Sequence, residues 1–326
     1  MKIGVIFTGG TIGSRQSDQG IAPTDDSPRR LLSLYRERTG DGSDFPTAEP
    51  YTILSENLSF AHITALAACV REKAGEWDGM IVTHGTDTLQ YTAAALSYLL
   101  GLKYPPTVLV SANYPLEDPR SNGLDNFCGA VDFLRSTPDA KGTYISYRNE
   151  QECTKIHRAS RLLPHRTFDD ALFSVGGPVA EIIEGKVYPV AEYSEQADGQ
   201  PPMNGNDLIV SDGRILFLNA HPGMRYPALD GAAAVLIGTY HSGTLATAGS
   251  PLRRFAMSAK KQNVPVFLAG TQVSGTAYES GNLFDRLGLI PLPPISPIAA
   301  YMKLCLAFSD GKDFNTALAL PLGGDL

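Results

Sequence analysis

The tetrapeptide Thr-Gly-Gly-Thr at residues 8–11 directly follows a short apolar run at residues 2–7. Paired glycines let a backbone turn sharply and approach a ligand closely. A threonine hydroxyl presented after such a turn, here that of Thr11, can attack an acyl carbon when another group removes its proton. A phosphate-binding loop and a plain tight turn are the alternatives. The segment lacks both the GxGxxG spacing and the Walker lysine, which disfavours nucleotide binding.

A second polar cluster, THGTDT at residues 83–88, follows the strand-like run at residues 79–83. It places three hydroxyls, an imidazole and a carboxylate around Gly85. Helix capping by Thr86 or Asp87 would explain one of these side chains but not the whole cluster. A carboxylate here can hold a substrate ammonium group through charge-assisted hydrogen bonds. The cluster therefore favours a binding site for a small polar molecule.

A third candidate is the pair Ser55 and Glu56, which follows the strand-like residues 51–54. A hydroxyl and a carboxylate are the groups expected around a zwitterionic amino acid. The sequence Ser-Glu-Asn is also ordinary loop and N-cap material, so this pair is the weakest of the three signals.

These polar segments need a scaffold, and the surrounding sequence alternates between strand-like and helix-like patterns. The pattern predicts strands at 2–7, 79–83 and 107–110, helices at 63–73, 91–100 and 123–134, and a hairpin from 143–147 and 154–163. Such alternation predicts an α/β fold with a parallel sheet covered on both faces. Ligands bind at the C-terminal ends of the strands in such a sheet, so we expect the three polar segments to surround one cavity.

The polar, Pro- and Gly-rich residues 193–206 have the composition of a linker. We therefore predict a larger N-terminal α/β domain at residues 1–190, a linker at 191–210 and a smaller C-terminal α/β domain at 211–326. In the smaller domain the pattern predicts strands at 215–219, 236–240 and 264–269, and helices near 228–235, before 262 and at 298–308.

Composition excludes several classes of function. With 43% hydrophobic and 19% charged residues, the 326-residue chain reads as an ordinary globular protein. Its formal charge of −7 gives no basic face for a nucleic acid. The N-terminal apolar run is too short for a signal peptide, and no stretch is long enough for a membrane span. The four cysteines lie far apart without metal-ligand spacing, so we expect a cytoplasmic protein without a metal site.

Four segments carry a resemblance to a known family: IGVIFTGGTIGS, ILSENLSFAHI, DGMIVTHGTDTL and PLEDPRSNGLDN. They resemble successive signatures of the bacterial-type L-asparaginases, closest to the cytoplasmic branch. Later segments such as VPVFLAGTQVSG are also similar, so the resemblance covers nearly the whole chain. It implies two α/β domains and a site in the larger one that is completed across the interface of a homodimer or homotetramer. It also implies hydrolysis of L-asparagine to L-aspartate and ammonia without a cofactor.

The resemblance assigns roles to individual residues of this chain. Thr11 matches the catalytic threonine that acts as the nucleophile. Thr86 and Asp87 match the Thr-Asp pair of the second cluster. Ser55 and Glu56 match the positions that hold the α-carboxylate and the α-amino group of the substrate, although Glu56 replaces a more common neutral residue.

The glycines of the two motifs, Gly10 and Gly85, belong to the expected substrate-binding set. Backbone N–H groups near them are expected to stabilise the oxyanion that forms when the amide carbon is attacked.

Two positions depart from the family pattern. Pro164 stands where the family has its catalytic lysine, and proline can neither carry charge nor relay a proton. Lys155 lies at the start of the preceding strand, about nine residues away, which at ~3.3 Å per residue is too far to substitute. The neighbouring His165 could take the role through a one-residue slip. Ile21 stands where the family usually has a tyrosine.

These departures leave a second interpretation open, a catalytically weak or inactive homologue that binds a small amino acid. A third interpretation, an amidotransferase subunit that supplies ammonia to another enzyme, requires a further partner-binding domain. We expect no room for such a domain in a chain of 326 residues.

Overall fold

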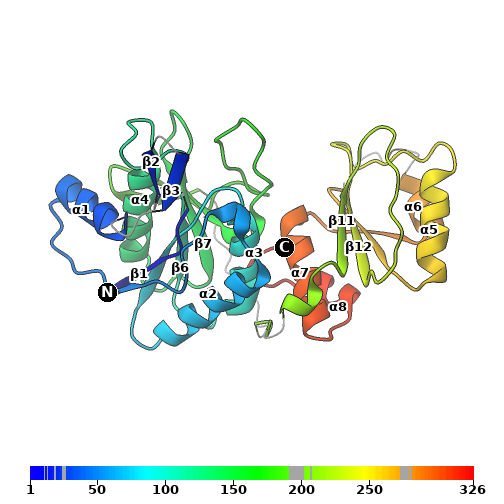
Figure 1. Cartoon of the computed structure of the whole chain (residues 1–326), viewed down its shortest axis with the longest axis horizontal. Helices are drawn as coiled ribbons and strands as arrows, with labels where there is room; N and C mark the ends of the chain where they lie inside the picture. Colours follow the sequence, from blue (N-terminus) through cyan, green and yellow to red (C-terminus); the bar gives the residue numbers. More distant parts are fainter. Residues whose placement is uncertain are drawn as a thin grey trace. The chain divides into compact units, whose positions relative to one another are not determined.

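The structure is a computed structural model that describes residues 1–10, 12, 14–17, 20–23, 27–190, 202–205, 208–271, 278 and 281–326. The chain forms two compact units, Met1–Met203 with Leu322–Gly324, and Asn204–Pro321 with Asp325–Leu326. The division falls inside the predicted linker at 191–210, most of which lies outside the described residues. Each unit has its own sheet (Figure 1). Within the described ranges, no helix has both the length and the apolar character needed to cross a bilayer.

The first unit is built on an eight-stranded sheet in the order β10-β9-β8-β7-β6-β5-β1-β4. Its strands are β1 (Ile3–Phe7), β4 (Thr47–Ala48), β5 (Gly79–Thr83), β6 (Thr107–Val110), β7 (Thr143–Arg148), β8 (Thr154–Arg158), β9 (Ala180–Ile183) and β10 (Lys186–Pro189). The five strands from β4 to β7 are parallel, which confirms the predicted α/β class. From β7 to β10 the strands pair antiparallel. Short hairpin connections at 149–153 and 184–185 allow only an antiparallel return.

Helices cover both faces of this sheet. On one face, α1 (Ser27–Thr39) packs beside α4 (Gly123–Ser136), and on the other α2 (Phe60–Lys73) packs beside α3 (Leu89–Leu100) (Figure 1). The helix α2 buries Ile63, Leu66, Ala67 and Val70, the helical face that the sequence predicts. Because both faces are covered, every residue of β1, β5 and β6 is buried.

The direction in which successive strands are added to the sheet reverses at β1. The connection through α1 places β4 on one side of β1, and the next connection through α2 places β5 on the other side. In an open parallel sheet, such a switch point leaves a crevice at the C-terminal strand ends, where ligands bind. The polar segments that follow β1 and β5 both lie at this edge.

The predicted strand at residues 51–54 is wrong. Only Ile53 pairs there, through an isolated bridge to Gly9, and the chain then turns into the 3₁₀ helix η2 (Ser55–Asn57). The bridge lies directly beyond the end of β1, where Ile53 N–H donates to the carbonyl of Thr8 at 3.2 Å. One bridge residue is enough to bring Ser55 to the switch point.

The remaining elements of the first unit are short. The strands β2 (Ser14–Ser17) and β3 (Gly20–Pro23) form a separate antiparallel pair, and Ile21 lies in β3. The 3₁₀ helix η3 (Ala159–Arg161) follows β8 and leads into a long loop at residues 163–173.

The residues Leu322–Gly324 return from the far end of the chain to the first unit. Two of their carbonyls accept hydrogen bonds from η3. The Ser160 hydroxyl donates to the carbonyl of Gly323 at 2.8 Å, and the Arg161 Nε donates to the carbonyl of Gly324 at 2.6 Å. The tail therefore supports the segment from which the loop at 163–173 departs.

The second unit has a four-stranded parallel sheet in the order β11-β12-β13-β14. Its elements are η4 (Leu208–Ser211), β11 (Ile215–Asn219), β12 (Ala234–Gly238), α5 (Pro251–Lys261), β13 (Val266–Ala269), α6 (Asn282–Leu287), β14 (Leu289–Pro291), α7 (Pro297–Ser309) and α8 (Phe314–Ala319). Figure 1 shows α5 and α6 on one face of this sheet and α7 and α8 on the other.

The helix predicted near residues 228–235 is wrong. Residues 228–233 form a turn around Gly231 (φ +74°), and the alanine-rich run continues into the central strand β12. The run has helical propensity, but its end is fully buried between β11 and β13, and this packing overrides the local preference.

Candidate functional site

The backbones of the two glycine motifs are in direct contact at the switch point. Gly10 has φ +79°, and a Cβ atom added to it would lie 2.3 Å from the backbone nitrogen of Gly85. The N–H of Gly10 donates to the carbonyl of Ile53 at 3.1 Å. This N–H is therefore engaged within the loop. The lack of a side chain at Gly10 permits the close approach of the two motifs.

Ser55 joins the third polar segment to the second. Its hydroxyl donates to Oδ2 of Asp87 at 3.2 Å, and the hydroxyl of Thr88 donates to the carbonyl of Ser55 at 2.9 Å. A Cβ atom on Gly85 would lie 2.4 Å from the Ser55 Cβ. These contacts fix the carboxylate of Asp87 beside a buried hydroxyl. Glu56 follows Ser55 on η2 and is exposed.

The side chain of His84 connects the loop after β5 to α3. Its Nδ1 lies 2.8 Å from the carbonyl oxygen of Gly85, and its Nε2 lies 2.9 Å from the hydroxyl of Thr92 on α3. Burial lowers the pKa of His84 to about 4, so the ring is uncharged near neutral pH. Its role is to hold the loop after β5, not to transfer protons.

A polar cavity of about 390 Å³ opens beside Thr86 and Asp87. Its remaining lining residues come from α3, from the end of β6, from β7 and from the loop at 163–173, and they are Gln90, Asn113, Tyr147, His165, Arg166, Thr167, Phe168, Asp169 and Asp170. Glu56 is not among them. A cavity of this size and polarity suits a small charged molecule.

The loop at 163–173 is held at both ends and near its middle. Leu163 N–H donates to the carbonyl of Phe173 at 2.9 Å, and the Tyr147 hydroxyl donates to the carbonyl of Asp170 at 2.8 Å. The side chain of Asn149 accepts from the N–H of Leu172 at 2.9 Å. The cavity wall is thus attached to β7 and the turn that follows it.

Of the residues that line this cavity, Thr86, Asp87 and His165 are predicted from the sequence as site residues, whereas Asn113 and Tyr147 are not. Asn113 follows β6 on the same sheet edge, so the strand-end argument would have found it. Tyr147 is a buried strand residue whose hydroxyl reaches the loop, and no local pattern marks it. Thr11, the expected nucleophile, lies outside the described residues.

No lysine is among the described residues that line this cavity. Pro164 is exposed on the loop, and Lys155 forms an ion pair with Glu152 at 2.7 Å. Every lysine of the chain lies within the described ranges, and none of them forms an ion pair with Asp87 there. In the part of the chain that the structure describes, no group of three His, Cys, Asp or Glu side chains could hold a metal ion.

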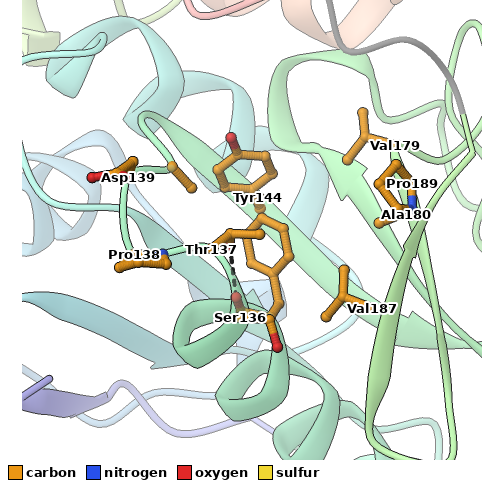
Figure 2. Close-up of a pocket in the computed structure, with 11 residues that line it drawn as sticks. Ser136, Thr137, Pro138, Asp139, Tyr144, Val179, Ala180, Val187 and Pro189 are labelled. Atoms are coloured by element: carbon orange, nitrogen blue, oxygen red, sulfur yellow. Dashed lines mark hydrogen bonds between the residues drawn. The ribbon is translucent and has the colours of Figure 1, made fainter.

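A second cavity in the same unit is mainly apolar and has a volume of about 310 Å³ (Figure 2). It lies between the end of α4, the start of β7 and the β9–β10 hairpin, with the rings of Phe133 and Tyr144 4.8 Å apart. The Thr137 hydroxyl already donates to the Phe133 carbonyl at 2.6 Å, and the Tyr144 hydroxyl donates to Lys141 at 2.9 Å. Asp139 is exposed and points away from the rings (Figure 2). This cavity lacks the groups that would orient a zwitterion.

Comparison with known proteins connects the polar cavity to a family. A family model described as "Asparaginase, N-terminal" matches residues 2–192, which include all the residues lining the cavity. An L-asparaginase from Thermococcus kodakarensis is 25% identical, over 97% of this chain and 95% of that protein. L-asparaginase 1 from Escherichia coli K12 is 35% identical over 40% of this chain and 39% of its own length. A glutamyl-tRNA(Gln) amidotransferase component from Methanosarcina mazei is 27% identical over 100% of this chain and 78% of that protein.

Solved structures share the fold. The thermostable L-asparaginase from Thermococcus kodakarensis superimposes with a TM-score of 0.79 at 24% identity, covering 100% of this chain and 99% of that one. A probable cytoplasmic L-asparaginase from Campylobacter jejuni gives a TM-score of 0.72 at 21% identity, covering 97% and 98% of the two chains. The family match extends over more than half of the chain and contains the whole polar cavity. The chain therefore belongs to the asparaginase family.

Proposed function

We propose that this chain hydrolyses the side-chain amide of L-asparagine to L-aspartate and ammonia, with Thr11 as the nucleophile. The observation that carries the proposal is the hydrogen bond from Ser55 to Asp87 beside a polar cavity at the switch point. A hydroxyl and a carboxylate at this place suit the two charged ends of an amino acid. Membership of the asparaginase family supports the same class of reaction.

Each residue has a distinct part in the proposed reaction. The hydroxyl of Thr11 attacks the amide carbon, the C–N bond breaks, and ammonia leaves an ester that water then hydrolyses. Thr86 positions the attacking water. Asp87 holds the substrate ammonium group, to which exposed Glu56 adds negative charge, and Ser55 contacts the α-carboxylate. A backbone N–H of the Gly85 segment stabilises the oxyanion, an effect worth roughly 3–4 kcal/mol in other acyl-transfer enzymes.

We further propose that the chain acts as a homodimer or homotetramer in the cytoplasm. The resemblance to the bacterial-type family implies a site completed across a subunit interface. The similarity to a probable cytoplasmic L-asparaginase supports the location. Light scattering of the purified protein tests the assembly, and a monomer at assay concentration would contradict it. Cell fractionation tests the location.

A binding protein with little or no turnover is the alternative. The observation in its favour is the absence of a lysine partner for Asp87 among the described residues, since Lys155 is committed to Glu152. Such a protein would hold asparagine or aspartate in the same cavity without releasing ammonia.

The direct test is ammonia release from L-asparagine and L-glutamine by the wild-type protein and by Thr11→Ala. Release by the wild type that the variant loses supports the proposed hydrolase. No release from either amide, together with tight aspartate binding by calorimetry, supports the binding protein instead. Glutamine hydrolysis that needs an added tRNA and a partner protein would point to the function named for the Methanosarcina relative.

A further inference from the structure

His165 lies in the wall of the polar cavity, together with Thr86 and Asp87. Its Nε2 atom is buried and has no hydrogen-bond partner among the described residues. A buried ring nitrogen without a partner is unfavourable, because it loses water without gaining another hydrogen bond. A bound substrate or water is therefore the expected partner of this atom.

The ring of His165 is held in place by its surroundings. It packs edge-on against Tyr147, with 6.2 Å between the ring centroids. Tyr147 is fixed in turn, because it lies on β7 and its hydroxyl donates to the carbonyl of Asp170 at 2.8 Å. Asp170 belongs to the same loop as His165, so the loop and the strand together determine where the imidazole lies.

The charged groups around the ring set its protonation state. Burial lowers the pKa of His165, while the carboxylates of Asp170, Asp169 and Asp87 oppose this shift. Arg166, also in the cavity wall, adds a positive charge. The net effect is a pKa below the ordinary value, so the ring is mainly neutral near pH 7 and can accept a proton.

Three other lining residues are poorly suited to this task. Arg166 stays protonated and cannot accept a proton. Burial raises the pKa of Tyr147 to about 12, so its hydroxyl keeps its proton and already donates to Asp170. The carboxylate of Asp87 accepts from Ser55. His165 is thus a lining group whose protonation can change in both directions near neutral pH.

We propose that His165 is a catalytic residue that transfers the proton in amide hydrolysis, through its Nε2 atom. This assignment depends on the proposed function. When the amide carbon is attacked, Nε2 accepts the proton of the attacking hydroxyl, directly or through Thr86. It then gives that proton to the departing amide nitrogen, which leaves as ammonia. In the second half of the reaction, the hydrolysis of the ester, Nε2 takes a proton from the attacking water and gives it to the threonine oxygen as the ester bond breaks.

The test compares His165→Gln and His165→Ala with the wild type across pH 4–9, measuring ammonia release from L-asparagine. His165→Gln is expected to lower kcat about 100-fold or more while KM changes little, since general acid–base catalysis typically contributes 10²–10⁴-fold. The fall in wild-type activity at low pH should disappear from the residual activity of the variant. Added imidazole should restore activity to His165→Ala, because the truncated side chain leaves room for it.

His62→Gln is the matched control. His62 is half-buried and contacts Ser59 at the start of α2, outside the cavity lining, so its substitution should leave kcat and the pH profile unchanged. Aspartate binding by calorimetry reports whether each variant keeps a folded site. If His165→Gln fails to fold, the rescue of His165→Ala by imidazole decides the question, since a purely structural role would give no rescue.

The outcomes separate this inference from the proposed function. An active wild type whose His165→Gln variant keeps the same kcat and low-pH behaviour would overturn the role of His165 alone. So would a large loss of kcat that imidazole does not restore in a folded His165→Ala variant. A wild type that releases no ammonia would overturn both proposals, and this failure is seen before any variant is made.

Discussion

The hydroxyl of Ser55 donates to the carboxylate of Asp87 at 3.2 Å, although the two residues lie 32 positions apart. Ser55 is only 7% exposed, whereas Asp87 is exposed, so the bond lies at the boundary between the buried loop and solvent. It joins the segment after the Ile53 bridge to the segment after β5. The bond therefore fixes the direction of the Asp87 carboxylate before any substrate arrives.

Replacing Ser55 with alanine is expected to weaken ligand binding. A hydrogen bond to a charged group contributes about 1.5–3 kcal/mol, so the affinity for L-aspartate should fall by roughly tenfold or more. Isothermal titration calorimetry measures the affinity of the variant and of the wild type for L-aspartate. Ser43→Ala is the matched control, because Ser43 donates to Asp41 at 2.6 Å outside the cavity lining. Equal affinities in Ser55→Ala and the wild type would contradict the assigned role.

A methyl group at Gly10 should disrupt the site more than a methyl group at a glycine in open space. Gly10→Ala combines a left-handed backbone with a Cβ 2.3 Å from the Gly85 nitrogen. Gly40→Ala has a similar φ of +70° but meets no atom within 4 Å. We expect about 1–2 kcal/mol of lost stability at Gly40, and about 1–3 kcal/mol more at Gly10. Urea unfolding measures both, and equal losses would show that the two motifs are not in contact.

Two buried histidines should make the protein less stable as the pH falls. Burial lowers the pKa of His84 and of His157 to about 4 in the folded state. The unfolded chain binds protons at both residues near pH 6.5, whereas the folded chain does not. The free energy of unfolding is therefore expected to decrease from pH 6.5 towards pH 4, by roughly 3 kcal/mol per histidine, since one pKa unit is 1.36 kcal/mol.

Urea unfolding of the wild type and of His157→Gln at several pH values checks this prediction. The variant should show a shallower dependence on pH between 6.5 and 4 than the wild type. Parallel curves for His157→Gln and the wild type would mean that His157 titrates alike in the folded and unfolded states.

A lysine at position 164 should partly replace His165. Pro164 is exposed and adjacent to His165, so a lysine side chain there can reach the same cavity wall. In the His165→Gln background, Pro164→Lys is expected to recover about tenfold in ammonia release, part of the typical acid–base contribution. Pro164→Gln in that background controls for the loss of the proline ring. Equal rates in the two double variants would show that position 164 does not face the substrate.

The sequence predicted the core of the first unit well because its signals are local. Buried β1 and β5 read as short apolar runs, and α2 shows its apolar face at helical spacing. The polar residues just after these strands mark the ligand edge for the same reason. Thr86 and Asp87 were found in this way.

Other features depend on contacts between distant residues and leave no local pattern. The alanine-rich run into β12 has helical propensity, and only burial between two neighbouring strands makes it extended. Tyr147 lines the cavity because its hydroxyl reaches Asp170, 23 positions later in sequence. The orphaned Nε2 of His165 is likewise visible only once the loop is closed.

The tail at Leu322–Gly324 has a consequence for how the protein is made. The carbonyls that receive Ser160 and Arg161 belong to residues synthesised more than a hundred positions after the rest of the first unit. At about 5–20 residues per second, the ribosome needs on the order of ten seconds to cover that distance. During this time η3 lacks its partners, and so does the base of the loop that bears His165. The support of this loop is therefore completed only after residues 322–324 have been made, so a nascent chain that stops before them should not hydrolyse amides.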